Sequence, residues 1–237
     1  MSPRSRSLLF FIATLLLAAV FVRLGLWQVS RLRERRGKNA VALAARQAPT
    51  LVYDDPGQVA KIPDVAMDNR RVRVIGRFDH AADIVLRGQS EGGVPGVRII
   101  TPLRPLRGDS AILVQRGFVV APDARSVNLA VLQEEGIHTI TGIAFVQPAS
   151  GVDGAPLEEQ GQLTWRRVDL AALRARLPYP LHSWVLLQLP DSSLPALPRR
   201  DDPPVLDDGP HFSYAVQWLS FAITAVVVGV VVGFRRK

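Results

Sequence analysis

The sequence has no cysteine among its 237 residues. This absence excludes a disulfide, a thiolate nucleophile, a covalently attached c-type haem, an iron–sulfur cluster and a zinc site with cysteine ligands. Methionine is almost as scarce, because Met67 is the only one besides Met1. The four histidines are 58, 44 and 29 residues apart, and these spacings are typical of no metal site. Copper delivery needs clustered Cys, Met or His ligands and is therefore not expected.

The motifs of the common enzyme classes are missing as well. The sequence contains no Gly-x-Ser-x-Gly elbow, no His-Glu-x-x-His, no phosphate-binding loop and no dinucleotide fingerprint. Adjacent carboxylates such as Asp54-Asp55 and Asp201-Asp202 lie in Pro-containing linkers, where nothing would bury them and perturb their pKa. We therefore predict that the protein is not an enzyme, and we disfavour a membrane-anchored hydrolase in particular.

The excess of positive charge is confined to a few short segments. The net charge is +8, from 29 Lys and Arg against 21 Asp and Glu. Residues 39–210 hold 18 basic and 20 acidic side chains and sum to −2, so the excess lies beside two apolar runs. A nucleic-acid-binding domain carries such an excess on its own surface. We therefore predict no nucleic-acid partner and assign the basic flanks to a lipid bilayer.

Two apolar runs are long enough to cross a membrane. Leu8–Val29 contains only Arg23 as a charge, and its 22 residues would form a helix of about 33 Å. A cleaved signal peptide is the rival interpretation, but no Ala-x-Ala site follows this run. The second run, Phe212–Phe234, is uncharged and ends in Arg-Arg-Lys, which is typical of a cytoplasmic stop signal.

Two spans place both termini on one side of the membrane and the middle of the chain on the other. Because long loops are translocated largely regardless of their charge, we expect cytoplasmic termini and an extracytoplasmic domain in a two-pass protein of the inner or plasma membrane. The predicted segments are a tail and first span at 1–30, a juxtamembrane helix at 31–49, a domain at 50–191, a Pro-rich tether at 192–210, and a second span with a basic tail at 211–237.

Within the domain, short strands outnumber helices. Arg71–Phe78 alternates exposed arginines with apolar residues, which predicts a strand with one wet face. Further strands are predicted at Asp83–Arg87, Val97–Pro102, Ala111–Val119, Ile137–Val146, Leu163–Val168 and Trp184–Leu189. The remaining segments are predicted as short helices at Asp123–Glu135 and Asp169–Arg176 and a loop at Pro148–Gln162. The fold class is therefore a membrane protein of α+β type, in which two transmembrane helices flank a mainly antiparallel β domain, either a curled sheet or a small barrel.

One group of residues is brought to a single membrane surface by this topology. His211, Tyr214 and Trp218 are spaced i, i+3 and i+7 on the second span, and Trp27 and Arg31 are spaced i and i+4 on the first. One interpretation is an aromatic belt with an arginine that reaches lipid phosphates. The other is a site for a flat amphipathic ligand, with imidazole as an axial iron ligand and arginine paired with propionates.

The same residues also resemble a known family. The segment from Gly25 through Trp27 and Gln28 to Arg31 is similar to the Gly-x-Trp-Gln-x-x-Arg signature of the Surfeit locus protein one family, the assembly factors of haem–copper cytochrome c oxidase. The likeness continues in order through residues 74–78, 95–96, 101–103, 113–118, 141–142, 165, 168–169 and 211–218. It covers nearly the whole chain. Gly209-Pro210 stands where the family usually has two asparagines, and Phe118 where Trp is common.

The resemblance implies a non-enzymatic factor that assists insertion of haem a into the oxidase catalytic subunit. His211 matches the histidine that has been linked to haem in this family, which makes it a candidate ligand of the haem iron. The candidate cofactor-binding residues are Trp27, Gln28, Arg31, His211, Tyr214 and Trp218. The expected partners are transiently bound haem a, the catalytic subunit, haem a synthase and the bilayer. The alternative is a structural chaperone that binds an oxidase subunit without touching haem.

Overall fold

The computed structural model describes residues 3–53, 59, 62–147, 156–159 and 162–235. It divides into two compact units. The first consists of Met1–Val41 and Leu206–Lys237, and the second of Ala42–Val205. The boundary between the units falls inside the first helix, which runs without a break through the predicted first span and juxtamembrane segment.

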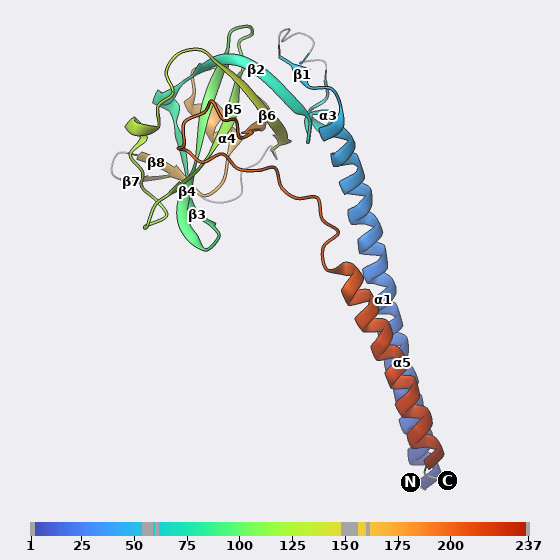
Figure 1. The fold of residues 1–237 in the computed structure, drawn as a ribbon. Coiled ribbons are helices and arrows are strands. Elements are labelled where there is room, and N and C mark those ends of the chain that lie inside the picture. Colours follow the sequence, from blue (N-terminus) through green and yellow to red (C-terminus); the bar gives the residue numbers. More distant parts are fainter. Residues whose placement is uncertain (1–2, 54–58, 60–61, 148–155, 160–161, 236–237) are drawn as a thin grey trace. The chain divides into compact units, whose positions relative to one another are not determined.

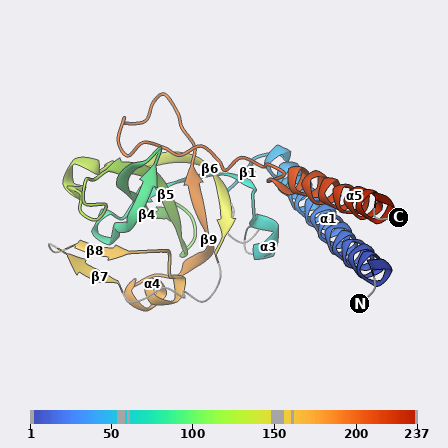
Figure 2. The ribbon, with the colours of Figure 1, turned by 90° about the horizontal axis from the view of Figure 1, so that it is seen from below.

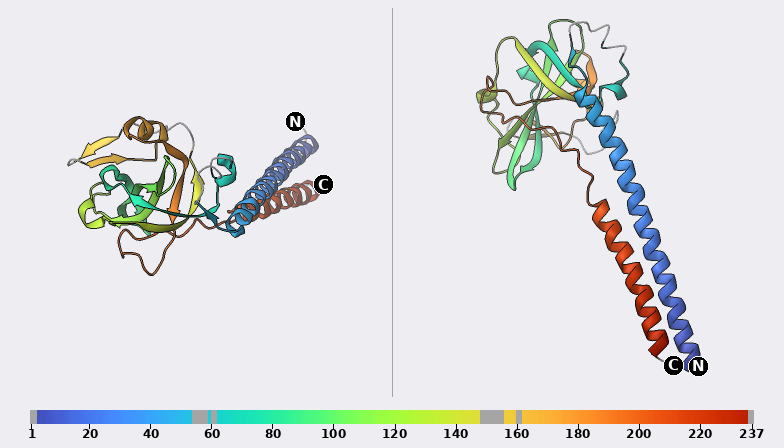
Figure 3. Two further views of the ribbon diagram at one scale, coloured as in Figure 1. Left: turned by 90° about the horizontal axis from the view of Figure 1, so that it is seen from above. Right: turned by 45° about the vertical axis from the view of Figure 1, so that its right-hand side comes forward.

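The first unit is a pair of helices, α1 (Pro3–Gln47) and α5 (His211–Arg235). Both are long and apolar enough to cross a membrane, at Ser5–Gln47 and His211–Gly233. Within this unit they lie side by side (Figures 1 and 3). Their contact surface contains small residues, since a Cβ atom on Gly229 would lie 2.3 Å from Thr14 Oγ1 and one on Gly25 would lie 3.0 Å from Leu219. Such small residues allow close backbone approach, which is how apolar helices pack in lipid.

The second unit is built on one sheet, which has nine strands in the described part of the chain. The strands are β1 (Leu51–Val52), β2 (Arg71–Phe78), β3 (Ile84–Glu91), β4 (Val94–Pro105), β5 (Ala111–Val120), β6 (His138–Val146), β7 (Leu157–Glu159), β8 (Gln162–Trp165) and β9 (Leu181–Gln188). Short helices connect them, namely α3 (Asp64–Met67), η1 (His80–Ala82), η2 (Leu129–Leu132) and α4 (Leu170–Arg176) (Figure 2).

The sheet is mixed and curls back on itself. Its strand order is β1-β2-β6-β9-β5-β4-β3-β8-β7, and β2 also pairs with β4 through Gly76–Phe78. The strands β2, β6, β9, β5 and β4 therefore form a cycle of pairings. Six pairings are antiparallel, and three are parallel: β1–β2, β3–β8 and β5–β9. The prediction of a mainly antiparallel domain is confirmed by six of the nine pairings, but the parallel ones were not predicted, and two of them, β3–β8 and β5–β9, join strands far apart in the chain.

Apolar side chains pack on both faces of this sheet. One cluster includes Val72, Val74, Val114 and Leu186. A second lies on the opposite face of β5 and β9, where Leu113 and Val185 pack with α4 through Leu170 and Leu173. Because successive residues of a strand point to opposite faces, neighbouring residues of β5 and β9 serve different clusters. This two-sided burial explains why these strands read as continuous apolar runs in the sequence.

Most predicted elements appear, with shifted ends. The prediction for β2 is confirmed at both ends, and α4 is confirmed with Asp169 as its N-cap, which accepts a hydrogen bond from the Ala172 N–H at 3.0 Å. The strand predicted to reach Val168 ends at Trp165. The short elements β1 and α3 were not predicted, and β7 lies in the predicted loop 148–162, of which residues 148–155 and 160–161 are outside the described residues.

The helix predicted at Asp123–Glu135 is wrong. Only Leu129–Leu132 is helical, as the 3₁₀ segment η2. Asp123 Oδ1 accepts hydrogen bonds from the Arg125 and Ser126 N–H groups, and Asn128 Oδ1 accepts one from Ala130 N–H. Short polar side chains that bond to nearby backbone in this way favour turns over a continuous helix.

Three consecutive residues attach the Pro-rich segment to the sheet. Arg199 exchanges two backbone hydrogen bonds with Phe118, at 2.8 and 2.9 Å. Arg200 donates to Glu134 Oε1 at 2.5 Å, and Asp201 accepts from Arg98 and Gln115 at 3.0 and 2.8 Å. The segment predicted as an extended tether is therefore also part of the β domain at these positions, where its trace crosses the strands in Figure 1.

Candidate functional site

The turn before α5 positions the candidate histidine. Gly209 has a φ of +65°, and its N–H donates to Asp207 Oδ1 at 3.1 Å. The turn is fixed to α1 because Arg35 donates to the Asp207 carbonyl and Arg36 pairs with the Asp208 carboxylate at 2.9 Å. These contacts all lie within the helix-pair unit. They hold the first residue of α5, His211, beside the middle of α1.

His211 and Gln28 are hydrogen-bonded to each other. His211 Nδ1 lies 2.9 Å from Gln28 Oε1. An amide oxygen only accepts, so with this amide orientation Nδ1 carries the proton and donates it. In the neutral imidazole the other ring nitrogen, Nε2, then holds the lone pair. Gln28 is 9% exposed and His211 is half-buried, and Nε2 makes no hydrogen bond to a described residue.

The structure places Trp27 and Arg31 together, but Arg31 and His211 form no hydrogen bond with each other. The Arg31 guanidinium lies 5.7 Å from the centroid of the Trp27 ring. It also pairs with Glu34 at 2.7 Å, and Lys38 pairs with the other oxygen of Glu34 at the same distance. Both partners of the Arg31–Glu34 pair are about half exposed, and exposed pairs of this kind contribute only about 0–1 kcal/mol. Arg31 is therefore available to a competing anion at small cost.

Tyr214 and Trp218 have different surroundings. The Trp218 ring stacks on Phe21 of α1 with a centroid distance of 5.7 Å and also contacts Phe221 at 5.9 Å. The side chains of Tyr214 and Trp27 are 46% and 50% exposed. Trp218 is therefore part of the helix contact, whereas Tyr214 and Trp27 lie at the surface of the helix pair.

Sequence reasoning missed Phe21, Phe221 and Glu34 at this site. Phe21 and Phe221 belong to apolar runs in which every residue is a plausible contact, so the sequence does not single them out. The pairing of Glu34 with Arg31 could have been predicted, because Glu34 is the only acidic residue before Asp54 and lies three residues after Arg31. Oppositely charged residues at this spacing face each other on a helix.

A second polar cluster is buried in the β domain. Arg116 is 0% exposed and donates to Glu134 Oε1 at 2.6 Å, and Arg200 shares that oxygen. Burial raises the pKa of Glu134, but the hydrogen bonds and charges of Arg116 and Arg200 outweigh it and hold the pKa below its ordinary value. His80 lies in the same cluster and accepts from Glu134 N–H at 2.9 Å. Most of the donors here are satisfied internally, as in a structural network, although Arg200 Nε and Glu134 Oε2 are buried without a hydrogen-bond partner in the described structure.

The carboxyl group of Asp83, beside this cluster, is also buried. Burial raises its pKa more than the hydrogen bonds from Thr101 and His80 lower it. His80, His138 and His182 make hydrogen bonds to protein groups, as expected for structural histidines. No group of three or more His, Asp or Glu side chains that could hold a metal ion occurs among the described residues.

A groove of about 380 Å³ lies on the sheet beside the Pro-rich segment. Its apolar wall contains Leu86, Phe145, Val185 and Leu187. Its polar wall contains the Arg98–Asp201 ion pair, three glutamines and Asp202. None of the residues predicted for the membrane-surface site lines this groove.

Comparison with known proteins agrees with the sequence signature. The model of the SURF1 family matches residues 15–223. A SURF1-like protein of Monosiga brevicollis is 27% identical over 95% of this chain and 87% of its own length. A SURF1-like protein of Rickettsia felis is 24% identical over 95% of this chain and 96% of its own length. The cytochrome oxidase assembly protein SHY1 of Saccharomyces cerevisiae is 28% identical over 62% of this chain and 36% of that protein.

Proposed function

The chain belongs to the SURF1 family, and from this premise we propose that it is an assembly factor for a haem–copper cytochrome c oxidase. Support comes from the similar yeast protein SHY1, which is a cytochrome oxidase assembly protein. The two long apolar helices support a membrane location, which is where an integral oxidase is assembled. We further propose that the factor acts without catalysing a reaction and works on the oxidase catalytic subunit, with haem a synthase as a second partner.

The finer proposal is that the factor handles haem a at the helix-pair site, with His211 as an axial ligand. The observation that carries it is the hydrogen bond between Gln28 and His211 Nδ1. Histidine ligands of metals almost always donate their second ring N–H to a protein acceptor, which fixes the tautomer and the ring orientation. Gln28 supplies this acceptor and leaves the Nε2 lone pair for iron.

The surroundings of His211 suit a flat, amphipathic cargo. A Cβ atom on Gly209 would lie 3.8 Å from Nε2, so the glycine leaves space beside the ligating nitrogen. The exposed rings of Trp27 and Tyr214 offer apolar faces to a macrocycle. Arg31, whose only ion pair among the described residues is the exposed one with Glu34, could exchange Glu34 for a propionate. Arg31→Ala should therefore weaken haem retention by about 1–2 kcal/mol, the value of one charge-assisted hydrogen bond.

The test compares three variants of the full chain, purified in detergent from cells that make haem a. His211→Gln should lose bound haem and lower the haem a content of the oxidase, with protein level and membrane insertion unchanged, because an amide is a poor iron ligand. His211→Gly should lose haem in the same way and regain it when free imidazole is added. Tyr214→Phe is the matched control, since it keeps the ring and should retain haem.

A different outcome would favour the alternative function. If wild type and His211→Gln bind equal amounts of haem, or if imidazole does not restore binding to His211→Gly, then His211 is not a ligand. The protein would then act as a structural chaperone that binds an oxidase subunit without touching haem. The groove beside the Pro-rich segment is a surface through which such a chaperone could hold a subunit.

We also propose the orientation that the sequence predicts for the two spans. The basic residues at both ends of the chain would stay in the cytoplasm, and residues 31–210 would lie outside it, anchored in the inner or plasma membrane. Because the apolar run of α1 ends at Val29 and α5 begins at His211, which is hydrogen-bonded to Gln28, the candidate haem site would then lie at the outer membrane surface.

A further inference from the structure

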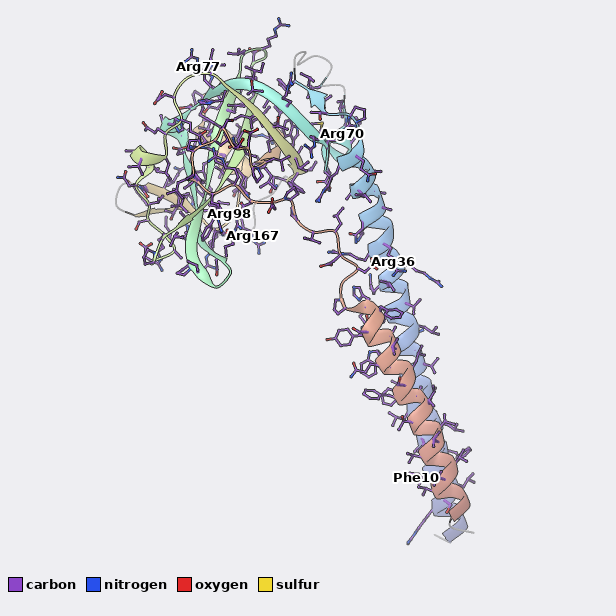
Figure 4. All side chains as sticks on the ribbon, viewed as in Figure 1. Phe10, Arg36, Arg70, Arg77, Arg98 and Arg167 are labelled. Carbon is purple, nitrogen blue, oxygen red and sulfur yellow. The ribbon has the colours of Figure 1, made fainter. Side chains whose placement is uncertain are left out.

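The outer face of β2 carries a row of exposed arginines. Arg71, Arg73 and Arg77 are exposed and alternate with buried residues of the strand. None of the three makes an ion pair or a hydrogen bond through its side chain in the described structure. Figure 4 shows Arg77 at the outer surface of the domain. Residues two apart on a strand are about 6.8 Å apart, so Arg71 and Arg73 have this spacing, and Arg77 follows at twice the distance because Ile75 lies between it and Arg73.

A fourth arginine increases the charge of this face. Arg104 of β4 is directly opposite Arg77 in the antiparallel register, and it lies 5.3 Å from the centroid of the Tyr179 ring. Like charges directly opposite each other destabilise a sheet. On the other side of β2, Arg73 is opposite Thr141, which carries no charge. The arrangement therefore opposes folding slightly, and stability does not account for it.

The rest of the domain does not compensate this face. Residues 42–205 hold 18 basic and 18 acidic side chains, so the unit is neutral as a whole. Several of its acids are already paired elsewhere, such as Glu134 with Arg116 and Arg200. The potential over β2 is therefore positive in a domain with no net charge, and such a patch attracts an anionic partner.

We propose that this arginine row binds an acidic segment of a partner protein that lies along β2 in an extended conformation, with carboxylates at alternate positions. Arginine pairs with carboxylates in bidentate geometry, and alternate side chains of an extended peptide repeat at the same 6.8 Å spacing. β2 is already paired with neighbouring strands on both sides, so the segment contacts its side chains and does not add a strand. The proposal does not depend on haem binding by His211.

An anionic lipid surface is the competing partner, and the composition of the face disfavours it. Segments that bind membranes combine basic residues with aromatic or large apolar side chains that enter the interface. Ile75, at 39% exposure, is the only apolar side chain among the four outward residues of β2 from Arg71 to Arg77. The row therefore offers charge and spacing, which suit a polar acidic peptide better than a bilayer.

The test measures binding of two labelled heptapeptides to the full chain in detergent by fluorescence anisotropy. One peptide alternates glutamate and threonine, and the other has the same composition with its glutamates in one block. Wild type should bind the alternating peptide more tightly than the block peptide, and higher salt should weaken binding. Arg71→Gln with Arg73→Gln should lower the affinity about tenfold, since each exposed pair contributes a factor of roughly two to five.

A matched double variant controls for net charge. Arg125→Gln with Arg166→Gln removes two exposed arginines from other parts of the domain and should bind as wild type does. Arg71→Lys with Arg73→Lys keeps the charge but loses bidentate pairing, so it should give an intermediate affinity and guard against misfolding of the neutral variant.

Three results would overturn the proposal. The first is equal affinity of wild type and the Arg71→Gln, Arg73→Gln variant for the alternating peptide. The second is equal binding of the alternating and block peptides, which would indicate general charge attraction. The third is binding of phosphatidylglycerol vesicles that depends on Arg71 and Arg73 without any binding of the alternating peptide, which would assign the row to a membrane.

Discussion

At the scale of single residues, the buried carboxylate of Glu134 shows how much one side chain can contribute to the free energy of unfolding. It receives hydrogen bonds from two arginines that are themselves 0% and 3% exposed. Replacing it with Gln leaves both guanidinium charges buried without compensation, and removing one partner of a buried ion pair typically costs about 3–5 kcal/mol. Glu134→Gln should therefore lower the free energy of unfolding by about 3 kcal/mol at neutral pH.

The pH dependence of this loss follows from the pKa of Glu134. The arginines hold the folded-state pKa below the ordinary value of 4.5, so the unfolded chain binds the proton first as the pH falls. The stabilisation is therefore complete above the ordinary pKa and is lost as the pH falls from about 4.5 through the folded-state pKa. Urea unfolding followed by tryptophan fluorescence should show wild type and Glu134→Gln converging in acid.

The control for this measurement is the neighbouring residue. Glu135 is exposed and its carboxylate makes no ion pair in the described structure, so Glu135→Gln should change stability by less than about 0.5 kcal/mol. Equal stabilities of Glu134→Gln and Glu135→Gln at neutral pH would contradict the assignment of a structural role to the buried cluster.

Single residues also mark the limit of what the sequence predicts about the site. The spacing of His211, Tyr214 and Trp218 correctly places all three on α5, and the two-helix arrangement brings Gln28 to His211. The direct hydrogen bond between Gln28 and His211 was not predictable, because it depends on how the two helices are rotated about their axes. That rotation is set by tertiary contacts at small residues such as Gly25 and Gly229, which have no periodic signal of their own.

At the scale of elements, the attachment of the Pro-rich segment depends on one glycine of β5. Gly117 has a φ of +136°, and a Cβ atom at this position would lie 2.1 Å from the Arg199 carbonyl oxygen. Gly117→Ala therefore combines an unfavourable backbone conformation with a clash against the segment. It should destabilise the domain by about 2 kcal/mol or more and release the Arg199 and Phe118 amides to hydrogen exchange.

Gly136→Ala separates the two causes. Gly136 also has a positive φ, of +98°, but a Cβ atom there would meet nothing within 4 Å. This variant should lose about 1 kcal/mol from strain alone and keep the Arg199 amide protected. If Gly117→Ala also leaves Arg199 protected, the pairing of the segment with β5 is not what holds it.

The strands differ in how clearly the sequence predicts them. β2 was predicted because its alternation of exposed and buried residues spans the whole strand. β1 and β7 have two and three residues, too few to establish a period, and they pair only because neighbouring strands provide the hydrogen bonds. The contacts of Arg199, Arg200 and Asp201 escaped prediction for a related reason, since each is a single residue whose partner lies at least 60 residues away.

At the scale of the whole molecule, the testable expectation is the orientation of the domain. A reporter that is active only outside the cytoplasm, inserted in the predicted loop Pro148–Gln162 ahead of β7, should be active. We expect this activity because short basic tails are retained in the cytoplasm while a long middle segment is exported. A cytoplasm-only reporter at the same position is the control, and its activity would refute the proposed topology.

The strand order has a consequence for the time course of folding. β9 lies between β6 and β5 in the sheet, so an interior strand is the last one synthesised. The cycle of pairings cannot close until residue 188 has emerged, and the contacts of Arg199 to Asp201 come later still. Pairings between segments this distant in sequence form slowly, because the loop must close before its contacts contribute. We therefore expect β5 and β6 to remain unpaired along one edge until β9 has left the ribosome. A nascent chain stalled before β9 should be readily degraded by proteases.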